Sequence, residues 1–166
     1  NWHYYMGEGM RDIVDPNMDF TPKIVDAVLT WLANLVVRLG GKKLDDRERW
    51  KDCCLLLPGD TRLPLQQRSL VVRAKSQQAR YTIGVTTIKP ERYGTSLCLR
   101  AYQSCNIIYR RELSREDIIP HSEMEGGARS SIAVPVGAET GQALGVLYVT
   151  SYDTDAFSVE DQRVLR

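Results

Sequence analysis

Two short apolar runs near the carboxyl end constrain the fold more than any other feature of the sequence. They cover Ser130 to Val136 and Ala143 to Thr150, are rich in β-branched residues, and are separated by a polar stretch that contains Gly137 and Gly141. This pattern predicts a β-hairpin. In the second run apolar residues fall on both faces of the strand, so we expect the hairpin to lie in the middle of a sheet that is covered on both sides.

A helix is expected to follow this hairpin. Ser158 and Asp161 form a capping-box-like start, and Glu160 and Asp161 lie where the positive end of a helix dipole favours acidic residues. We therefore expect a helix from about residue 158 that is cut off by the end of the sequence at Arg166. Together with a first residue that is not Met, this predicts that the sequence is a piece of a longer protein.

The first part of the chain predicts a long amphipathic helix. Residues 1–18 show no steady periodicity, and we expect an irregular segment there, followed by a single domain over residues 19–166. Thr21 as N-cap, Pro22 at the first helical position and the Gly40-Gly41 pair as a stop predict a helix over about residues 21–39. We expect its apolar stripe to cover the sheet, to pack against a second copy of the chain, or both; the stripe consists of Ile24, Val28, Trp31, Leu32, Leu35 and Leu39.

Shorter patterns predict the sheet and loops, which fill about residues 50–150. The expected strands are Trp50 to Leu57, Ser69 to Lys75, an alternating segment from Tyr81 to Thr87, and Asn106 to Tyr109. Thr95 is expected to cap a short helix that ends near Ser104. A long loop then reaches Gly127, and loops of that length in compact domains are usually functional or mobile.

Composition excludes several classes of protein. The 166 residues are 43% hydrophobic and 26% charged with a formal net charge of +1, which is typical of a globular protein and not of a disordered or nucleic-acid-coating one. No run is apolar enough to cross a membrane. The four cysteines, Cys53, Cys54, Cys98 and Cys105, have no disulfide or metal-ligand spacing, so we expect a cytoplasmic setting and no metal site, and leave a redox role for the cysteines open.

Three motifs, taken in order, resemble a known family. They are small-Arg-Ser-x-x-Ala-Val-Pro-Val from Ala128, Leu-Gly-Val-Leu from Leu144, and Phe-Ser-x-Glu-Asp from Phe157. This order is similar to the closing half of a GAF domain, the small-molecule sensor module of bacterial signalling proteins, and residues 88–109 are similar to the helix-then-strand passage of the same family. The resemblance covers about residue 50 to the end. It implies an α/β (α+β) fold with a central antiparallel sheet, terminal helices on one face, and loops plus a short helix on the other.

The resemblance also implies a function. We expect a regulatory sensor domain that binds an unidentified small molecule and relays the signal through its terminal helices to an attached effector domain outside this segment. It further implies a homodimer through those helices, no nucleic-acid partner, and a ligand site between the sheet and the segments after the Asn106 strand. The candidate ligand-binding residues offer polar groups near an apolar wall: Tyr109, Asp117, His121, Arg129 and, from the short helix, Arg100 and Tyr102. The cofactor, if any, is left unknown.

The same family contains enzymes, the free-methionine sulfoxide reductases, which use cysteine thiols. Aligning their His-x-x-Cys segment with His121-Ser-Glu-Met124 places Met124 where a reactive cysteine is required, and Ser96 falls near another such position. Because a thioether cannot become a thiolate nucleophile, we expect no enzymatic activity and no catalytic residues. Two alternatives to the sensor stay open. One is a ligand-free dimerisation or packing module whose pocket is filled by Ile107, Ile118 and Ile119, and the other is a thiol- or metal-based redox sensor.

Overall fold

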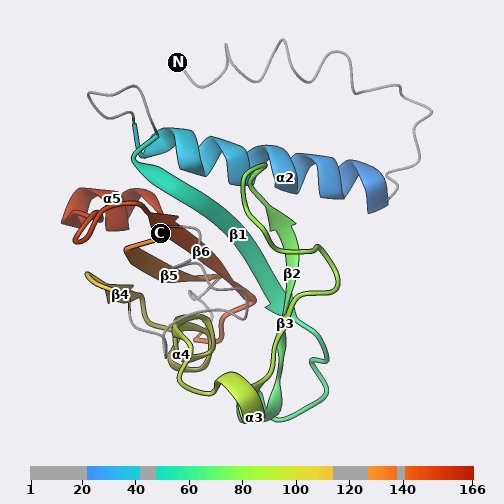
Figure 1. Cartoon of the computed structure of the whole chain (residues 1–166). Helices are drawn as coiled ribbons and strands as arrows, with labels where there is room; N and C mark the ends of the chain where they lie inside the picture. The colour runs from blue at the N-terminus through green and yellow to red at the C-terminus, as the bar shows by residue number, and fades with distance from the viewer. Residues whose placement is uncertain (1–21, 42–47, 114–126, 138–140) are drawn as a thin grey trace.

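One antiparallel sheet of six strands organises the structure, a computed structural model that describes residues 22–41, 48–113, 127–137 and 141–166. The strands lie in the order β3-β2-β1-β6-β5-β4 (Figure 1). Their bounds are β1 Trp50–Pro58, β2 Leu70–Lys75, β3 Thr87–Ile88, β4 Ile108–Arg110, β5 Ser130–Val136 and β6 Gly145–Ser151. The helices are α2 Pro22–Leu39, α3 Pro90–Tyr93, α4 Leu97–Ser104 and α5 Val159–Val164, with a 3-10 turn over Leu65–Gln67.

The predicted hairpin is present and lies inside the sheet. Strands β5 and β6 pair from Ser130 opposite Ser151 to Val136 opposite Gly145, and β6 also pairs with β1. Neither strand is at an edge, as expected from the apolar residues on both of their faces. The second strand begins later than predicted, because Leu144 belongs to the connection and is 65% exposed.

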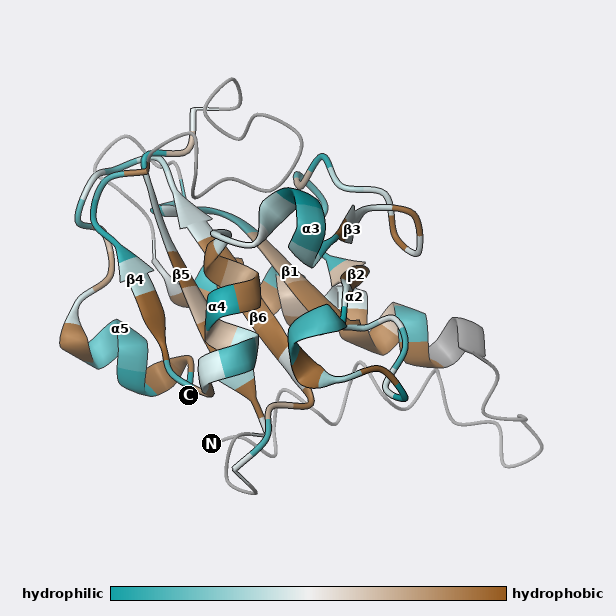
Figure 2. Cartoon of the chain, turned by 90° about the horizontal axis from the view of Figure 1, so that it is seen from below, coloured by the Kyte–Doolittle hydropathy of each residue, from teal (hydrophilic) through white to brown (hydrophobic). Residues whose placement is uncertain are grey.

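Helices cover the two faces of the sheet unequally. On the first face, called here the α4 face, Cys54, Ala133, Val146 and Tyr148 share a core with the buried residues of α4, which packs over β5 and β6. On the opposite face, called here the α2/α5 face, Cys53, Ile132, Val134 and Val149 meet α2 and the segment that leads into and includes α5. Figure 2 shows α4 lying across β5 and β6, with apolar strand residues beneath it. The expected layers, with terminal helices on one face and a short helix on the other, are therefore confirmed, and so is the α+β fold class.

Local capping chemistry accounts for where two helices begin. Ser158 and Asp161 form the expected capping box at α5, with the Ser158 hydroxyl accepting from the Asp161 N–H and the Asp161 carboxylate accepting from the Ser158 N–H. At α4 the N-cap is Ser96 and not Thr95, because the Ser96 hydroxyl accepts from the Leu99 N–H. The predicted cap was therefore one residue too early.

The strand predicted from Tyr81 to Thr87 is wrong except at its end. Thr87 and Ile88 form the short strand β3 and pair with β2, and the Thr86 carbonyl accepts a further bond from the Val72 N–H. The preceding residues fold into a tight turn in which the N–H groups of Val85 and Thr86 bond to the Thr82 carbonyl, and Gly84 adopts φ +74°. A glycine in this left-handed conformation favours a turn over the alternating pattern on which the prediction rested.

Helix α2 turns a different side to the sheet from the one predicted. Ala33 and Val37 are buried against the α2/α5 face, whereas Val28, Trp31 and Leu32 of the predicted stripe are exposed. The helix is apolar on both sides, so periodicity could not decide which side the sheet covers. Among the described residues, no helix is long and apolar enough to cross a membrane.

Candidate functional site

The two predicted aromatic ligand-binding residues lie on opposite faces of the sheet. Tyr102, on α4, is buried in the core of the α4 face, and its hydroxyl accepts from Arg68 Nη1 at 3.2 Å. Tyr109, on β4, packs on the α2/α5 face, where its hydroxyl donates to Asp155 Oδ1 at 2.8 Å. Partial burial is the main cause that raises the pKa of Tyr109, and the hydrogen bond to the Asp155 carboxylate is the second. The structure therefore does not bring these two tyrosines to one site.

The remaining predicted site residues do not form a cluster in the described structure. Arg100 is exposed on α4, and Arg129 is exposed just before β5, where its backbone bonds to Ser151 and Leu113. Asp117 and His121 lie outside the described residues. Their roles as ligand contacts, like those of the two tyrosines, stay predictions.

A row of buried polar side chains crosses the α4 face at one end of the sheet. Thr150 on β6 lies opposite both Asp52 on β1 and Ser131 on β5, and each of the three is two residues from a core residue of the α4 face. We call Asp52, Thr150 and Ser131 the polar row. Their exposed fractions are 3%, 0% and 0%. Directly opposite residues of neighbouring strands have Cβ atoms about 5 Å apart, so the three side chains are neighbours.

The polar row has unused hydrogen-bonding capacity. In the described part of the chain, Asp52 Oδ1, Ser131 Oγ and Thr150 Oγ1 have no hydrogen-bond partner. A buried polar atom without a partner costs about 1 to 3 kcal/mol, and native proteins contain only a few such atoms. Three in one cross-strand row are therefore a local concentration of hydrogen-bonding capacity that a polar partner would satisfy.

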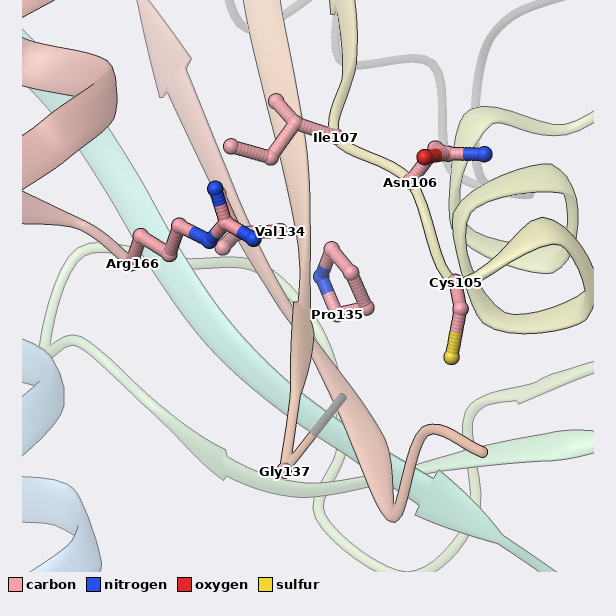
Figure 3. Close-up of a pocket in the computed structure, with 7 residues that line it drawn as sticks. All are labelled: Cys105, Asn106, Ile107, Val134, Pro135, Gly137 and Arg166. Carbon is pink, nitrogen blue, oxygen red and sulfur yellow. The ribbon is translucent and has the colours of Figure 1, made fainter. Parts of the chain in front are cut away.

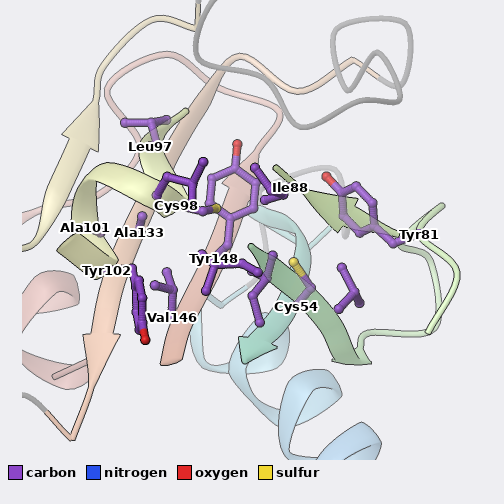
Figure 4. Packing of buried hydrophobic residues seen from close by; sticks show 14 of the residues in the cluster. Cys54, Tyr81, Ile88, Leu97, Cys98, Ala101, Tyr102, Ala133, Val146 and Tyr148 are labelled. Carbon is purple, nitrogen blue, oxygen red and sulfur yellow. The ribbon is translucent and has the colours of Figure 1, made fainter. Parts of the chain in front are cut away.

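Two tyrosines border the same region of the α4 face. The Tyr81 hydroxyl is buried and has no partner in the described part of the chain, and Tyr148 precedes Thr150 by two residues on β6. Figure 4 shows the hydroxyl groups of Tyr81 and Tyr148 pointing toward the end of the sheet at which β4 ends, the end that carries the polar row. Arg110, the last residue of β4, is half-buried and lies opposite Ser131.

A β-bulge at the start of β1 connects the polar row with the opposite face. Trp50 pairs with Ser151 and Asp52 with Thr150, so Lys51 is an extra residue in β1. Residues two apart in a regular strand share a face, but this extra residue places Trp50 on the α2/α5 face and Asp52 on the α4 face. The Lys51 ammonium group contacts Asp52 Oδ2 and is itself buried.

Trp50 and Arg49 contact both terminal helices. The Trp50 ring packs 5.4 Å from the Phe157 ring before α5, and lies against Gly40 at the end of α2, where a Cβ atom would come within 2.4 Å of Trp50 Cδ2. Arg49 Nη2 pairs with Asp161 Oδ2 of α5 at 2.7 Å. Partial burial acts to raise the pKa of Asp161, but hydrogen bonds from Ser158 and the Arg49 guanidinium lower it below its usual value. Asp52 of the polar row is thus two residues along the chain from Trp50 and three from Arg49.

The cysteines form no reactive or metal-binding cluster in the described residues. Burial, with a smaller effect of Asp52, raises the pKa of Cys53, and burial raises that of Cys98, so both thiols stay protonated at neutral pH. Cys54 is buried as well, whereas Cys105 is half-buried. No three His, Cys, Asp or Glu side chains among these residues converge to hold a metal ion.

Two surface hollows lie away from the polar row. One, of about 360 Å³, is lined by Cys105, Pro135 and Arg166 at the far end of β5, as Figure 3 shows. The other, of about 420 Å³, lies along α5 and includes Tyr109 and Asp155. Neither contains a buried carboxylate or hydroxyl that lacks a partner in the described structure. The hollows offer open volume, whereas the polar row offers unpartnered polar groups in a buried place, and those polar groups make the row the candidate site.

Sequence reasoning missed the polar row, although one signal was present. Lys51 and Asp52 are two adjacent charges inside an otherwise apolar strand, and buried charges in such a place are usually paired or functional. The row itself depends on the alignment of β1 with β6, which are about a hundred residues apart. By contrast, Ile107, one residue proposed to fill a pocket on the α4 face, packs on the α2/α5 face. Ile118 and Ile119 lie outside the described residues.

Comparison with known proteins identifies the fold. No protein-family model matches the sequence, and no curated protein matches it either. Solved structures do match. The GAF domain of a phosphoenolpyruvate-protein phosphotransferase from Acinetobacter has a TM-score of 0.64 at 19% identity, over 95% of this chain and 84% of that one. The GAF domain region of a putative membrane protein from Geobacter sulfurreducens has a TM-score of 0.59 at 17% identity, over 87% and 84% of the two chains.

A third match corrects the expectation that the chain is not an enzyme. The type II free methionine-R-sulfoxide reductase from Thermoplasma acidophilum has a TM-score of 0.63 at 15% identity, over 87% of this chain and 86% of that one. Other reductases of the same activity match as well. The expectation of no enzymatic activity is therefore wrong, because this architecture occurs in enzymes as well as in other GAF domains. Sensor and enzyme structures nevertheless agree on one architecture, and the chain has the GAF fold.

Proposed function

We propose that this chain is a GAF-like sensor domain that binds a small molecule at the polar row and relays binding through its terminal helices to an attached effector. The observation that carries the proposal is the set of buried, unpartnered groups of Asp52, Thr150 and Ser131. A ligand that bonds to them recovers free energy that the unliganded protein lacks. Small-ligand sites commonly combine an apolar wall with a few such placed polar groups, and the α4 face supplies the apolar wall.

The start of β1 supports the relay. Asp52 belongs to the polar row, while Trp50 touches α2 and the approach to α5, and Arg49 is ion-paired with α5. A ligand changes the position of the helices only if it binds one arrangement more tightly than another. Residues 49–52 are the short segment through which this preference reaches both helices.

A second copy of the chain is the proposed partner of α2. Along this helix, apolar residues recur at alternating spacings of three and four, which is the pattern of a coiled-coil seam. Val25, Val28, Leu32 and Leu39 of this series are exposed, and Leu35 is half-buried. Size-exclusion chromatography with light scattering tests the pairing. Leu32→Lys should yield a monomer with unchanged helix content, whereas Val85→Lys, at an exposed apolar residue far from α2 in sequence, should leave the dimer intact. A wild-type monomer would refute the pairing.

Ligand binding is tested with a metabolite library and two variants. Thermal-shift screening of the wild-type chain should find compounds that raise the melting temperature, as any ligand of the folded state does. The same compounds should lose most of their effect on Thr150→Val and keep it on Ser130→Ala, a neighbouring buried serine whose hydroxyl already donates to the Asp153 carbonyl. Compounds that stabilise all three proteins equally would show that binding occurs elsewhere, and a screen without any stabilising compound would refute the proposal.

Turnover of a small molecule is a second candidate function, favoured by the structural likeness to the free methionine-R-sulfoxide reductases. The chain should be incubated with methionine-R-sulfoxide and dithiothreitol, and methionine measured by chromatography. Methionine formation that is lost in Thr150→Val would assign turnover to the polar row. If methionine forms no faster than in a protein-free control, the chain does not catalyse this reaction.

A further inference from the structure

The Asp52 carboxylate defines one end of the ligand that the polar row accepts. Its Oδ2 atom already contacts the Lys51 ammonium, whereas Oδ1 is buried and has no partner in the described part of the chain. An ionised carboxylate only accepts hydrogen bonds. The group that meets Oδ1 must therefore be an N–H or O–H donor.

The charges beside Oδ1 favour a neutral donor over an ion. A ligand cation at Oδ1 would lie within a few ångströms of the Lys51 ammonium, because both would share one carboxylate, and like charges so close repel strongly in a buried site. A ligand anion would face the Asp52 carboxylate itself. Lys51 and Asp52 already neutralise each other, and Arg110 on β4 is three strands away from β1, so an ion added at Oδ1 would be buried without its own counter-charge, which is costly.

The next residue along the row supplies the complement to an acceptor. Thr150 lies directly opposite Asp52, and its unpartnered hydroxyl can donate to a carbonyl oxygen next to the donor that meets Oδ1. Ser131, on the far side of Thr150, offers a second hydroxyl. A planar amide edge, with N–H and C=O side by side, matches this pair: its N–H can donate to Asp52 Oδ1, and its C=O can accept from the Thr150 hydroxyl.

We infer that the polar row binds a neutral ligand through an amide-type edge, as in a carboxamide, a urea or a nucleobase, with its N–H on Asp52 Oδ1 and its C=O on the Thr150 hydroxyl. This inference rests on the proposed function, since it specifies the ligand of that same site. It is independent of whether binding is followed by signalling or by turnover.

Four probes of nearly equal shape test the ligand class: benzamide, acetophenone, benzamidine and benzoate. The first has the amide edge, the second lacks the donor, the third is a cation and the fourth an anion. Titrations of the isotope-labelled chain, followed by the amide resonances of β5 and β6, give the dissociation constants. Benzamide should bind about tenfold more tightly than each of the other three, the factor expected when one buried hydrogen bond is lost.

Matched variants locate the benzamide site. Thr150→Val keeps the shape of the side chain and removes the hydroxyl, so it should weaken benzamide about tenfold and leave acetophenone nearly unchanged. Ser130→Ala, on the opposite face, should change neither dissociation constant. Equal or tighter binding of acetophenone, benzamidine or benzoate would overturn the ligand class, as would benzamide binding that Thr150→Val does not affect. If benzamide fails these tests but compounds from the library still lose their stabilising effect on Thr150→Val, only the inferred ligand class is refuted. If no compound loses its effect on Thr150→Val, the proposed function is refuted as well.

Discussion

Adjacent serines on β5 provide a direct test of the polar row through stability. Ser130 and Ser131 are both fully buried, but they face opposite sides of the sheet. The Ser130 hydroxyl donates to the Asp153 carbonyl at 2.6 Å, whereas the Ser131 hydroxyl has no partner in the described structure. The same substitution, Ser→Ala, should therefore have opposite effects at neighbouring positions.

The expected magnitudes follow from these partners. Ser131→Ala removes a desolvated hydroxyl that costs about 1 to 3 kcal/mol, and the oxygen-sized space it leaves costs only about 0.3 kcal/mol, so a gain of about 1 kcal/mol is a conservative value. Ser130→Ala loses a formed hydrogen bond, worth about 1 kcal/mol. At roughly 2 to 4 °C per kcal/mol for a chain of this size, the melting temperatures of the two variants should differ by about 4 to 8 °C.

Calorimetry and urea unfolding of both variants measure the difference. The dependence of the unfolding free energy on urea should be the same in each, because neither substitution changes the surface exposed on unfolding. The reasoning is refuted if Ser131→Ala is destabilised as much as Ser130→Ala, since the Ser131 hydroxyl would then have a partner in the unliganded protein. Stabilisation by Ser131→Ala together with weaker ligand binding is the exchange of stability for function expected at a binding site.

Other parts of the structure make three further predictions. Gly40→Ala should destabilise the fold by about 1 to 3 kcal/mol, measured by urea unfolding, because its Cβ would overlap the buried Trp50 ring; an unchanged midpoint would contradict this contact. The lowered pKa of Asp161 contributes stability that is present above its unfolded pKa of about 3.9 and lost as pH falls through the lower folded value. Wild type should therefore lose more stability than Asp161→Asn between pH 5 and about pH 2, and parallel curves would exclude this contribution. In the native protein Cys105 should react with a thiol reagent well before the three buried cysteines, as mass spectrometry of labelled peptides would show; equal labelling would refute the burial pattern.

Features that depend on neighbouring residues could be predicted from the sequence. The capping box of α5 needs only Ser158 and Asp161, and the hairpin needs only two β-branched runs and the loop between them. The resemblance to GAF domains extended these local features to the order of layers. The capping box and the hairpin could be predicted because their deciding interactions lie close together along the chain. Local patterns were not always sufficient, since the turn around Gly84 was predicted as a strand and the cap of α4 was placed one residue early.

Features that depend on distant residues could not be predicted. The polar row exists because β1 and β6 align Asp52 with Thr150, and because a bulge at Lys51 changes the face that Asp52 occupies. Neither the register nor the bulge has a signature in the sequence. The orientation of α2 was missed for a related reason: both of its sides are apolar, and only the docked sheet selects Ala33 and Val37.

The bulge at Lys51 makes this point of the chain tolerant of a change in length. If Lys51 were deleted, Trp50 and Asp52 would become consecutive residues, and simple alternation would still send one to each side of the sheet. Every side chain from Asp52 onward would keep its place, and only the buried ammonium group would be gone. A Lys51 deletion variant is therefore expected to keep the architecture while leaving the Asp52 carboxylate uncompensated, which would change the preference of the proposed site from neutral compounds to cations.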